Sequence, residues 1–383
     1  MGAPLLAAAP WLAAMVFVLW RVRQSRSLDE YSAIALPDAP PLTVIVPARD
    51  EAANIGRCVA SLVQSSYRAL EIIVVDDHSA DDTSRIAVDA GAGDSRVRVV
   101  RAPDLPVGWL GKQWACAYGV SLARGRILCF TDADTVHGPD LHARSVRALL
   151  DRHADLLSVA GTQELGTFWE RLVQPQLFAV LFARYGGTEI VSRATRPEDV
   201  IANGQYLLFH RSVYDALGGH ASVKGKVAED LALAMRAKRQ GRRVHFIQGV
   251  GQLSTRMYSS LGAMVRGWMK NVYAGGIEAL PPGRFWRALY PLILFAPIVA
   301  WLAPPIALGL WALGNVSDAV GTWAIATSMI LFVWWVIVYG ALARRPWYAV
   351  LAPLGNLVLA YIFMRAVARG TAVEWKGRVY QVE

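Results

Sequence analysis

The sequence predicts an α/β domain, built on a mostly parallel sheet with helices on both faces, that is joined to transmembrane helices near both ends of the chain. In the middle of the chain, short runs rich in β-branched residues alternate with longer helical patterns, as in parallel α/β sheets. Composition is the second observation, because 54% of the 383 residues are hydrophobic and 18% are charged. Soluble domains carry about 25% charged residues, so part of this chain is expected in a membrane.

The uncharged residues are concentrated in four runs, each reaching the roughly 20 residues needed to cross a bilayer. These runs are 1–20, 288–317, 319–343 and 346–364. We therefore expect an N-terminal anchor over 1–20, about three transmembrane segments within 288–367, and a basic tail over 368–383. The intervening stretch 21–287 is long enough for one sizeable domain with its own core, ending in interfacial helices.

Basic residues indicate how the chain is oriented in the membrane. Arginines follow the first run, at 21–26, so the positive-inside rule predicts an outside N-terminus and a cytoplasmic domain at the inner membrane of the cell. Three further crossings place the basic pair 344–345 inside but leave the basic tail outside. The four prolines of run 288–317 instead allow it to break into a hairpin, which brings the tail inside and moves the pair 344–345 outside. The sequence leaves both topologies open.

The net charge of +9 does not indicate a nucleic-acid-binding protein. Basic residues crowd the ends of the apolar runs, as expected for anchoring to anionic lipid, and no zinc-finger, RNP-like or basic heptad pattern occurs. The three cysteines, Cys58, Cys116 and Cys129, are widely spaced in apolar surroundings. We expect them to be reduced, buried thiols of a cytosol-facing domain.

Periodicity predicts the elements of the central domain one by one. Runs rich in apolar and β-branched residues predict strands at 41–47, 71–75, 97–101, 127–131, 156–160 and 244–247. Helical patterns lie at 51–64, 79–90, 113–122, 141–150 and 229–240. Near-continuous apolar strands that alternate with helices predict a sheet that is covered on both faces.

Acidic residues directly follow three of the predicted strands. Asp50 and Glu51 follow the first strand, Asp77 follows the second, and Asp132 and Asp134 follow the fourth. Ligands of open α/β sheets bind outside the carboxyl ends of the strands. The three acidic segments are therefore expected to meet at one edge of the sheet.

Two of these segments have specific chemical interpretations. Asp132 and Asp134 form an Asp-x-Asp pair that suits Mg²⁺ or Mn²⁺ held together with a substrate phosphate. An isolated pair of this kind is more often an acidic turn with a helix cap, but the strand-end position and the company of Asp77 favour the metal interpretation. Asp77 itself is placed to bind a base or a ribose.

A further acidic pair, Glu229 and Asp230, begins the predicted helix 229–240. Acids in a first helical turn commonly just complement the helix dipole. If this helix end faces the same sheet edge, one of the two acids can act as a general base beside a metal-bound phosphate. The surrounding sequence leaves both interpretations open.

Several other enzyme classes lose support because their motifs are absent from the sequence. No Gly-x-Gly-x-x-Gly follows the first predicted strand, and the segment 108–113 has neither the spacing nor the hydroxyl residue of a P-loop. No His-Glu-x-x-His or Gly-x-Ser-x-Gly pattern occurs. Dehydrogenase, NTPase, zincin and serine hydrolase functions are thus disfavoured.

Taken in order, these motifs resemble a family 2 (GT-A fold) glycosyltransferase across about residues 41–275. The resemblance lies in the segments 46–51, 75–83, 130–134 and 229–230, which are specific as an ordered set. Segments 108–115, 203–205, 218–220 and 256–258 are similar to hopanoid-associated and carotenoid glycosyltransferases, and 373–380 is similar to ceramide glucosyltransferases. The resemblance implies a GT-A type sheet, a UDP-sugar donor and a membrane lipid acceptor.

The resemblance also implies roles for individual residues. Asp77 would contact the uracil and ribose of the donor, and Asp230 would be the catalytic base of an inverting transfer. Asp132 and Asp134 would hold a divalent metal, Mg²⁺ or Mn²⁺, against the diphosphate. The expected substrate-binding set is completed by Asp50, Glu51, Lys112, Glu229 and Arg256. The charges of Lys112 and Arg256 can offset that of the diphosphate, although an ordinary surface cation is an equally good interpretation of Lys112.

One family motif is altered in this chain. The Gln-x-x-Arg-Trp motif of processive synthases is absent, and the nearest segment has Gln252 and Arg256 four residues apart with Tyr258 in place of Trp. This change favours a single transfer to a lipid over polymer synthesis. A processive polysaccharide synthase and a non-catalytic, nucleotide-binding membrane scaffold are the two alternative functions.

Two aromatic segments suggest how a lipid acceptor reaches the enzyme. Residues 168–185 and 257–286 interrupt apolar and aromatic side chains with Arg and Lys, as interfacial helices do. A terpenoid, polyprenyl, hopanoid or sphingolipid-like acceptor would keep its tail in the leaflet while its hydroxyl reaches Asp230. A plain packing role for these aromatics is equally compatible with the sequence. His137 and His220 lack a partner at metal-ligand spacing and are expected to be structural.

Overall fold

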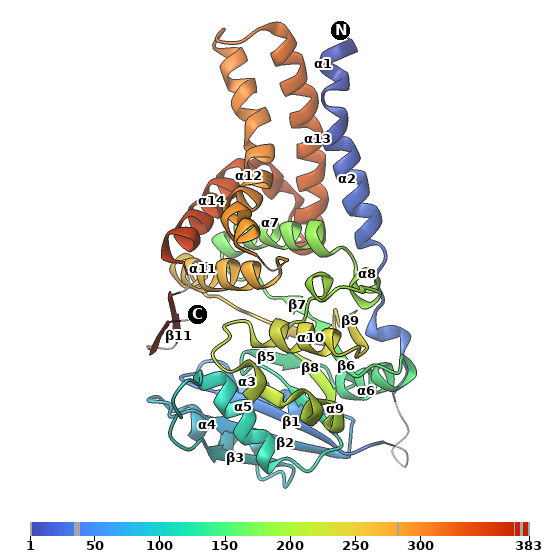
Figure 1. Cartoon of the computed structure of the whole chain (residues 1–383), viewed down its shortest axis with the longest axis vertical. Coiled ribbons are helices and arrows are strands. Elements are labelled where there is room, and N and C mark those ends of the chain that lie inside the picture. The colour runs from blue at the N-terminus through green and yellow to red at the C-terminus, as the bar shows by residue number, and fades with distance from the viewer. Residues whose placement is uncertain (1, 34–38, 282, 371, 376–377, 382–383) are drawn as a thin grey trace. The chain divides into compact units, whose positions relative to one another are not determined.

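The computed structural model describes residues 2–33, 39–281, 283–370, 372–375 and 378–381. The chain divides into two compact units, which are described one at a time (Figure 1). The first unit comprises Met1–Gln24, Leu165–Gly187 and Tyr258–Gly370, and the second comprises Ser25–Glu164, Thr188–Met257 and Thr371–Glu383. The second unit contains all of the expected site residues and is therefore described first.

A seven-stranded sheet forms the centre of the second unit. Its strands follow the spatial order β3-β2-β1-β4-β8-β6-β9, and all neighbours are parallel except β8, which is antiparallel to β4 and β6. The strands are β1 (Leu42–Ala48), β2 (Leu70–Asp76), β3 (Val97–Arg101), β4 (Ile127–Phe130), β6 (Leu156–Ala160), β8 (Leu207–His210) and β9 (Val244–Gln248). The predicted fold class, an α/β fold with a mostly parallel sheet, is confirmed.

Helices and short strands surround this sheet. The helical elements are η1 (Leu28–Glu30), α3 (Ile55–Val63), α4 (Thr83–Gly91), α5 (Gly111–Leu122), α6 (Leu141–Asp151), α8 (Thr188–Ser192), η3 (Pro197–Asp199), α9 (Arg211–Leu217), η4 (Gly219–Val223) and α10 (Glu229–Arg239). A three-stranded sheet contains β5 (Thr135–His137), β10 (Leu253–Thr255) and β7 (Thr162–Gln163). A two-stranded antiparallel sheet contains β11 (Ala372–Trp375) and β12 (Arg378–Gln381).

The two faces of the central sheet are covered by different helices. Val44 of β1 belongs to one apolar core together with Ile55 of α3. The next residue, Ile45, points the opposite way and contacts the position of Gly119 in α5. Because strand side chains alternate between faces, β1 is buried along its whole length, as a near-continuous apolar run predicts.

One strand of the sheet is not predicted from the sequence. β8 contributes four residues, and its first three are buried between β4 and β6. This apolar run leads directly into the helix α9, so periodicity alone does not separate a strand from the start of a helix here. Its antiparallel direction also depends on the long connection before it, which no local pattern records.

Two helices begin four residues later than predicted, α3 at Ile55 instead of residue 51 and α4 at Thr83 instead of residue 79. The residues that precede them are used in hydrogen bonds between the loops after β1 and β2. The Asp50 N–H donates to Ser79 Oγ, and the Ala80 N–H donates to Asp50 Oδ1. Hydrogen bonds from side chains to the backbone compete with helix formation. These residues therefore form hydrogen bonds between the two loops and do not extend the helices.

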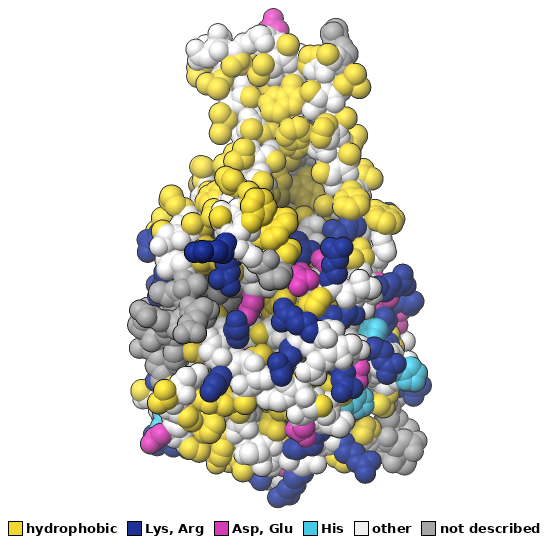
Figure 2. Space-filling model, viewed as in Figure 1, with side chains coloured by type: hydrophobic (Ala, Val, Ile, Leu, Met, Phe, Trp, Pro, Cys, Tyr) yellow, Lys and Arg dark blue, Asp and Glu magenta, His cyan; other side chains and the backbone are white. Residues whose placement is uncertain are grey.

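The first unit consists of helices. They are α1 (Gly2–Leu6), α2 (Ala9–Val22), α7 (Phe168–Tyr185), α11 (Leu261–Glu278), α12 (Arg284–Ala312), α13 (Asp318–Leu342), η5 (Pro346–Leu351) and α14 (Ala352–Arg369). Figure 1 shows α2 and α13 side by side, and Trp11 of α2 donates a hydrogen bond to the Ala300 carbonyl of α12. Figure 2 shows hydrophobic side chains covering the surface of the long helices.

Among the described residues of this unit, four helical stretches are long and apolar enough to cross a membrane: Ala3–Val22, Arg284–Ala312, Asp318–Leu342 and Pro346–Arg369. The proline-rich run 288–317 does not form a hairpin, because α12 continues without a break through all four of its prolines. Each proline removes one backbone donor, and the remaining turns keep their hydrogen bonds. The hairpin interpretation of this run is therefore wrong, and the run supplies one long helix.

The close packing of α5 on the sheet generates a stability prediction. A Cβ at Gly119 would lie 2.6 Å from Ile45 Cγ2 and 3.2 Å from Val75 Cγ2, so Gly119→Ala forces α5 away from β1 and β2. Overpacking of this kind costs about 1–3 kcal/mol of unfolding free energy, and we expect a lower unfolding temperature for the detergent-purified protein. Gly309→Ala is the matched control, since nothing lies within 4 Å of its added Cβ. An unchanged unfolding temperature for Gly119→Ala would contradict this account.

Candidate active site

The carboxyl ends of β1, β2 and β4 lie at one edge of the sheet. β1 is parallel to both neighbours, with Ala48 opposite Asp76 of β2 and Ile45 opposite Phe130 of β4. The acidic segments that follow these strands therefore leave the sheet on the same side. The N-terminal ends of α5 and α10 carry Lys112 and Glu229 to the segment that follows β4.

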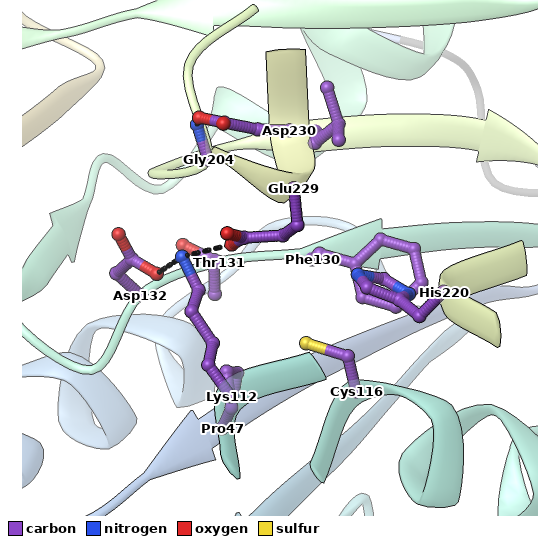
Figure 3. A pocket seen from close by; sticks show the side chains of 11 residues that line it. Pro47, Lys112, Cys116, Phe130, Thr131, Asp132, Gly204, His220, Glu229 and Asp230 are labelled. Carbon is purple, nitrogen blue, oxygen red and sulfur yellow. Dashed lines mark hydrogen bonds and ion pairs between the residues drawn. The ribbon is translucent and has the colours of Figure 1, made fainter. Parts of the chain in front are cut away.

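A small pocket at this edge collects residues from six separate parts of the chain. It is lined by Pro47, Lys112, Cys116, Phe130, Thr131, Asp132, Gly204, Leu207, His220, Glu229 and Asp230 (Figure 3). Lys112 Nζ lies 2.7 Å from Asp132 Oδ1 and 2.8 Å from Glu229 Oε1. A single ammonium group thus joins the turn after β4 to the start of α10.

Lys112 is not an ordinary surface cation. Burial opposes its positive charge, but Asp132, Glu229 and Asp230 outweigh this effect and raise the pKa of Lys112 well above the usual value. About a quarter of its side chain is exposed, compared with 11% of the side chain of Glu229. The ammonium group therefore stays charged at any physiological pH and holds the acidic residues around it.

The pKa values of Asp132 and Asp134 are both raised. Burial, followed by the charges of Asp132 and Glu51, raises the pKa of Asp134 to about 7. Burial also raises the pKa of Asp132, although Lys112 works against the shift. Asp134 Oδ1 is buried and has no hydrogen-bond partner among the described residues. A carboxylate oxygen in this state lacks the positive or hydrogen-bonding partner that buried charge requires.

Asp230 is held by two backbone N–H groups. Its Oδ2 accepts a 2.7 Å hydrogen bond from the Gly204 N–H, and its Oδ1 accepts one from the Leu231 N–H. Burial and then the charge of Glu229 raise its pKa to about 6. An acid with a pKa near 6 is poised to accept and release a proton near neutral pH.

Gly204 allows this arrangement because it has no side chain. A Cβ at this position would lie 3.0 Å from Asp230 Oδ2 and 3.2 Å from Lys112 Nζ. The loop around Gly204 is fixed on both sides, since the Gln205 carbonyl accepts a hydrogen bond from Thr131 Oγ1 and the Gln205 N–H donates to Asn203 Oδ1. Segment 203–205 therefore positions Asp230 relative to the turn after β4.

Gln113 fixes the segment that leads into α10. Its side chain accepts a hydrogen bond from the Gly225 N–H at 3.0 Å and donates one to the Lys226 carbonyl. Gln113 is 1% exposed, so these bonds are shielded from competing water. Gln113, the residue next to Lys112, thus positions the start of α10, where Glu229 and Asp230 lie.

Asp77 and its neighbours form a second polar group beside this pocket but outside its lining. Arg49 Nη1 donates a 2.7 Å hydrogen bond to the Asp77 carbonyl and lies 3.6 Å from Asp77 Oδ2. Asp50 accepts from the Ala80 N–H, and Glu51 accepts from Asn54 Nδ2. The contacts of Asp50 hold the loops after β1 and β2 together. The substrate-binding roles of Asp50, Glu51 and Asp77 stay predictions.

Arg256 follows β10 and is not among the residues that line the pocket. Its role as a diphosphate partner stays a prediction. Four residues that contribute to the site were not predicted from the sequence: Arg49, Gln113, Gly204 and Thr131. For Gly204 and Gln113 a signal existed in the family-like segments 203–205 and 108–115, whereas the contact between Arg49 and Asp77 follows from the tertiary structure alone.

The buried histidines and cysteines have structural surroundings, as expected. His137 Nε2 lies within 3.1 Å of the hydroxyls of Thr131 and Thr135, and His220 Nδ1 lies 2.7 Å from the hydroxyl of Tyr214. Burial lowers the pKa of His220 to about 4, so its ring is neutral and packs on Phe130. All three cysteines are free and buried.

The acidic pair fits a hard divalent cation. The described residues contain no group of three or more His, Cys, Asp or Glu side chains arranged to hold a metal ion. A cation bound by Asp132 and Asp134 would therefore need further oxygen ligands from water or substrate phosphate, which is the usual arrangement for Mg²⁺. The partnerless Asp134 Oδ1 and the mutual repulsion of the two acids support this fit.

Comparisons with known proteins show the family to which the chain is similar. The model of a family described as "Glycosyltransferase like family 2" matches residues 40–273. A 4,4'-diaponeurosporenoate glycosyltransferase of Staphylococcus haemolyticus (strain JCSC1435) is 30% identical over 248 residues, which is 63% of this chain and 63% of that protein, less than two thirds of its length. The protein of the same name from Staphylococcus aureus (strain USA300) is 28% identical over 358 residues, covering 89% of this chain and 88% of its own.

A solved structure shares the fold over nearly the whole chain. The mannosyltransferase PcManGT from Pyrobaculum calidifontis, in complex with GDP-Man and Mn²⁺, superposes with a TM-score of 0.55 at 19% identity. The match covers 96% of this chain and 97% of that protein. At this level of identity the comparison supports the fold, which agrees with the parallel sheet described above.

The ion pairs of Lys112 generate a prediction for stability. In Lys112→Met, Asp132 and Glu229 lose their shared partner, and we expect the unfolding free energy at pH 7 to fall by about 2 kcal/mol, because removing one member of a partly buried ion pair leaves charge uncompensated. Thermal unfolding in detergent measures the effect. Lys224→Met, at an exposed position, is the control. Equal stability of wild type and Lys112→Met would show that the ion pairs contribute nothing.

The raised pKa of Asp134 generates a prediction for pH dependence. Its pKa of about 7 lies above the value of about 4 in the unfolded chain, so the stability that its neutral form supplies is complete below about pH 4 and is lost as the pH rises to about 7. We expect metal-free wild type to lose stability relative to Asp134→Asn over this range. Above pH 7, Mn²⁺ should restore the stability of the wild type but not change that of Asp134→Asn. Unfolding temperatures of both proteins at several pH values test this, and parallel curves would contradict it.

Proposed function

The chain belongs to the family 2 glycosyltransferases, and from this premise we propose that it moves a sugar from a UDP-sugar to a membrane lipid in a single, inverting transfer. The observation that carries the proposal is the cluster of Lys112, Asp132, Glu229 and Asp230 in one pocket, with Asp134 beside it. A transferase of this class needs positive charge for a diphosphate and a base for an acceptor hydroxyl. The pocket contains residues suited to both needs.

We assign the diphosphate to the region around Asp132, Asp134 and Lys112. When bound there, a divalent cation such as Mg²⁺ or Mn²⁺ would stabilise the negative charge that gathers on the leaving diphosphate. Asp132 and Asp134 would hold the cation, and Lys112 would exchange one of its ion pairs for a phosphate oxygen. Asp77 would face the uracil and ribose, with Arg49 keeping its carboxylate in place. Asp50, Glu51 and Arg256 would complete the donor site.

Asp230 would act as the catalytic base. An acceptor oxygen attacks the anomeric carbon of the sugar as the bond from that carbon to the diphosphate breaks, which inverts the configuration. The proton of the acceptor hydroxyl passes to Asp230, whose pKa of about 6 leaves most molecules ionised at pH 7. Glu229 stays paired with Lys112 and keeps negative charge next to Asp230, which favours proton uptake.

The acceptor would be a terpenoid, polyprenyl, hopanoid or sphingolipid-like molecule. The Staphylococcus relatives are named for a carboxylate, 4,4'-diaponeurosporenoate, so an acidic terpenoid is a second acceptor to consider. A carboxylate is already deprotonated and needs no base. Replacement of Asp230 should therefore impair transfer to a hydroxyl far more than transfer to a carboxylate.

We propose that the enzyme is a multi-pass protein of the inner membrane whose catalytic domain faces the cytoplasm. Four helical stretches are apolar enough to span, and the arginines at 21–26 follow the first of them. The proposed division is an anchor at 1–20, a catalytic domain at 21–287 with interfacial helices at its end, membrane segments within 288–367 and a tail at 368–383. A lipid acceptor, the bilayer and the UDP-sugar are the expected partners, and nucleic acid is not.

The two carboxylates with the clearest roles provide the test of this function. We expect Asp134→Asn and Asp230→Asn each to lower transfer of radiolabelled sugar from UDP-sugar to extracted membrane lipid by at least about 100-fold, since a base alone contributes about 10²- to 10⁴-fold. Asp230→Asn should keep its affinity for UDP with Mn²⁺ in calorimetry, whereas Asp134→Asn should lose it. Asp151→Asn, an exposed acid at the end of α6, is the control.

Four outcomes decide between this function and its alternatives. Wild-type transfer by Asp230→Asn would remove the base assignment, and binding of GDP in preference to UDP would change the donor. A product that carries a long glycan would indicate the processive polysaccharide synthase. A lipid that gains one sugar of inverted configuration in mass and NMR spectra would support the proposed single transfer.

A further inference from the structure

The last apolar helix of the chain is α14. A transmembrane helix of a bundle packs mainly on other transmembrane helices, but α14 does not. Its contacts are mainly with α7, α11 and α12. The Ala352 carbonyl at its start accepts a hydrogen bond from Gln176 of α7, and Phe363 contacts Phe295 of α12. The position of α14 is therefore set by α7 and α11 as much as by a membrane-crossing helix.

The helices α7 and α11, on which α14 packs, form hydrogen bonds with the basic ends of the long helices α13 and α12. Gln176 also donates a hydrogen bond to the hydroxyl of Tyr339, which lies three residues before the end of α13. At the start of α12, the hydroxyl of Tyr290 donates to the Val272 carbonyl of α11. The pairs Arg284 and Arg287, and Arg344 and Arg345, lie beside these two ends. Figure 1 shows α12 and α13 continuing well beyond α7, α11 and α14 to the loop that connects them.

Charged residues keep α7 and α11 out of the hydrocarbon core. α7 contains Arg171 and Arg184, and α11 contains Arg266. Ionised side chains are costly at the centre of a bilayer and are tolerated near the headgroups. A helix that packs on α7 and α11 is consequently held near the headgroup level, although the stretch Pro346–Arg369 that contains α14 is apolar enough for a span.

The surface of α14 suits this shallow position. Leu354, Leu357, Tyr361 and Met364 follow one another at spacings of three, four and three residues, and they are 42%, 57%, 42% and 55% exposed. The opposite face, with Leu359 and Phe363, is buried in the unit. Arg365 follows the apolar stripe and donates a hydrogen bond to the hydroxyl of Tyr361. Such a stripe beside arginines matches a helix that lies in the plane of the membrane surface.

We propose that α14 does not cross the membrane and that its stripe of Leu354, Leu357, Tyr361 and Met364 contacts the acyl chains of the leaflet in which the basic ends of α12 and α13 lie. This proposal rests on the membrane placement given under the proposed function. The chain then has three spans, formed by the N-terminal helices, α12 and α13. The tail after Arg369 lies on the same side as the pair 344–345. Both groups of basic residues are inside, so this topology satisfies the positive-inside rule, which neither topology considered from the sequence did.

Cysteine accessibility in the full-length protein tests the topology. Single variants Asn315→Cys, in the loop between α12 and α13, Arg345→Cys and Ala368→Cys occupy exposed positions, and the three native cysteines are buried. We expect a membrane-impermeant maleimide to label Asn315→Cys in intact spheroplasts. Arg345→Cys and Ala368→Cys should be labelled in inside-out vesicles, with labelling in spheroplasts reduced at least about tenfold. The native protein without added cysteine is the background control.

The outcomes separate the two claims. Labelling of Ala368→Cys in intact spheroplasts, with Arg345→Cys still protected, would show that α14 crosses and would overturn this inference while leaving the proposed function in place. Protection of Asn315→Cys in spheroplasts would instead contradict the membrane orientation on which both claims rest. Labelling of Asn315→Cys alone in spheroplasts supports three spans.

A second measurement tests the lipid contact of the stripe itself. A nitroxide attached at Leu357→Cys should relax more strongly with oxygen than with a water-soluble nickel chelate, as a lipid-facing group does. A nitroxide at Arg365→Cys should show the smaller oxygen preference of the headgroup region. Met329→Cys, at an exposed position in the middle of α13, is the lipid-facing reference. Greater relaxation by nickel at Leu357→Cys would place the stripe in water and overturn the proposed contact.

Discussion

The ion pairs of Lys112 are the interaction on which the site depends. One ammonium group lies within 2.8 Å of acids from the turn after β4 and from the start of α10. Lys112, Asp132, Glu229 and Asp230 line one pocket, and burial raises the pKa of Asp132, Asp134 and Asp230. Four acids around one lysine leave an excess of negative charge. That excess destabilises the empty site and gives it affinity for a cation together with a phosphate.

Hydrogen bonds to the backbone keep this charged group in one arrangement. The Gly204 N–H holds Asp230, the Gln205 carbonyl holds Thr131, and Gln113 holds the segment before α10. Each bond joins parts of the chain that are far apart in sequence. The acids are therefore positioned by rigid loops at a sheet edge, which limits the reorganisation required when a substrate binds.

Sequence patterns identified the strands and the acidic residues because both leave local traces. β1 and β2 are seven-residue strands rich in apolar and β-branched residues, and Asp50 and Asp77 lie within two residues of their ends. The same patterns misplaced the starts of α3 and α4, since the bonds between Asp50 and the loop at 79–80 are invisible to periodicity. They also missed β8, because its apolar run leads directly into α9 and the period does not separate strand from helix there.

What the sequence determined by itself was the fold class, the family, the four apolar stretches and the acids at the strand ends. Each of these follows from residues close together in the chain, through the period of a strand, the length needed to cross a bilayer or the spacing of a motif. The tertiary structure decided that Lys112 pairs with acids 20 and 117 residues away, that Arg49 contacts Asp77, and that α14 packs on α7 and α11. Such contacts depend on how the sheet orders its strands and how helices stack, and no local pattern encodes that order.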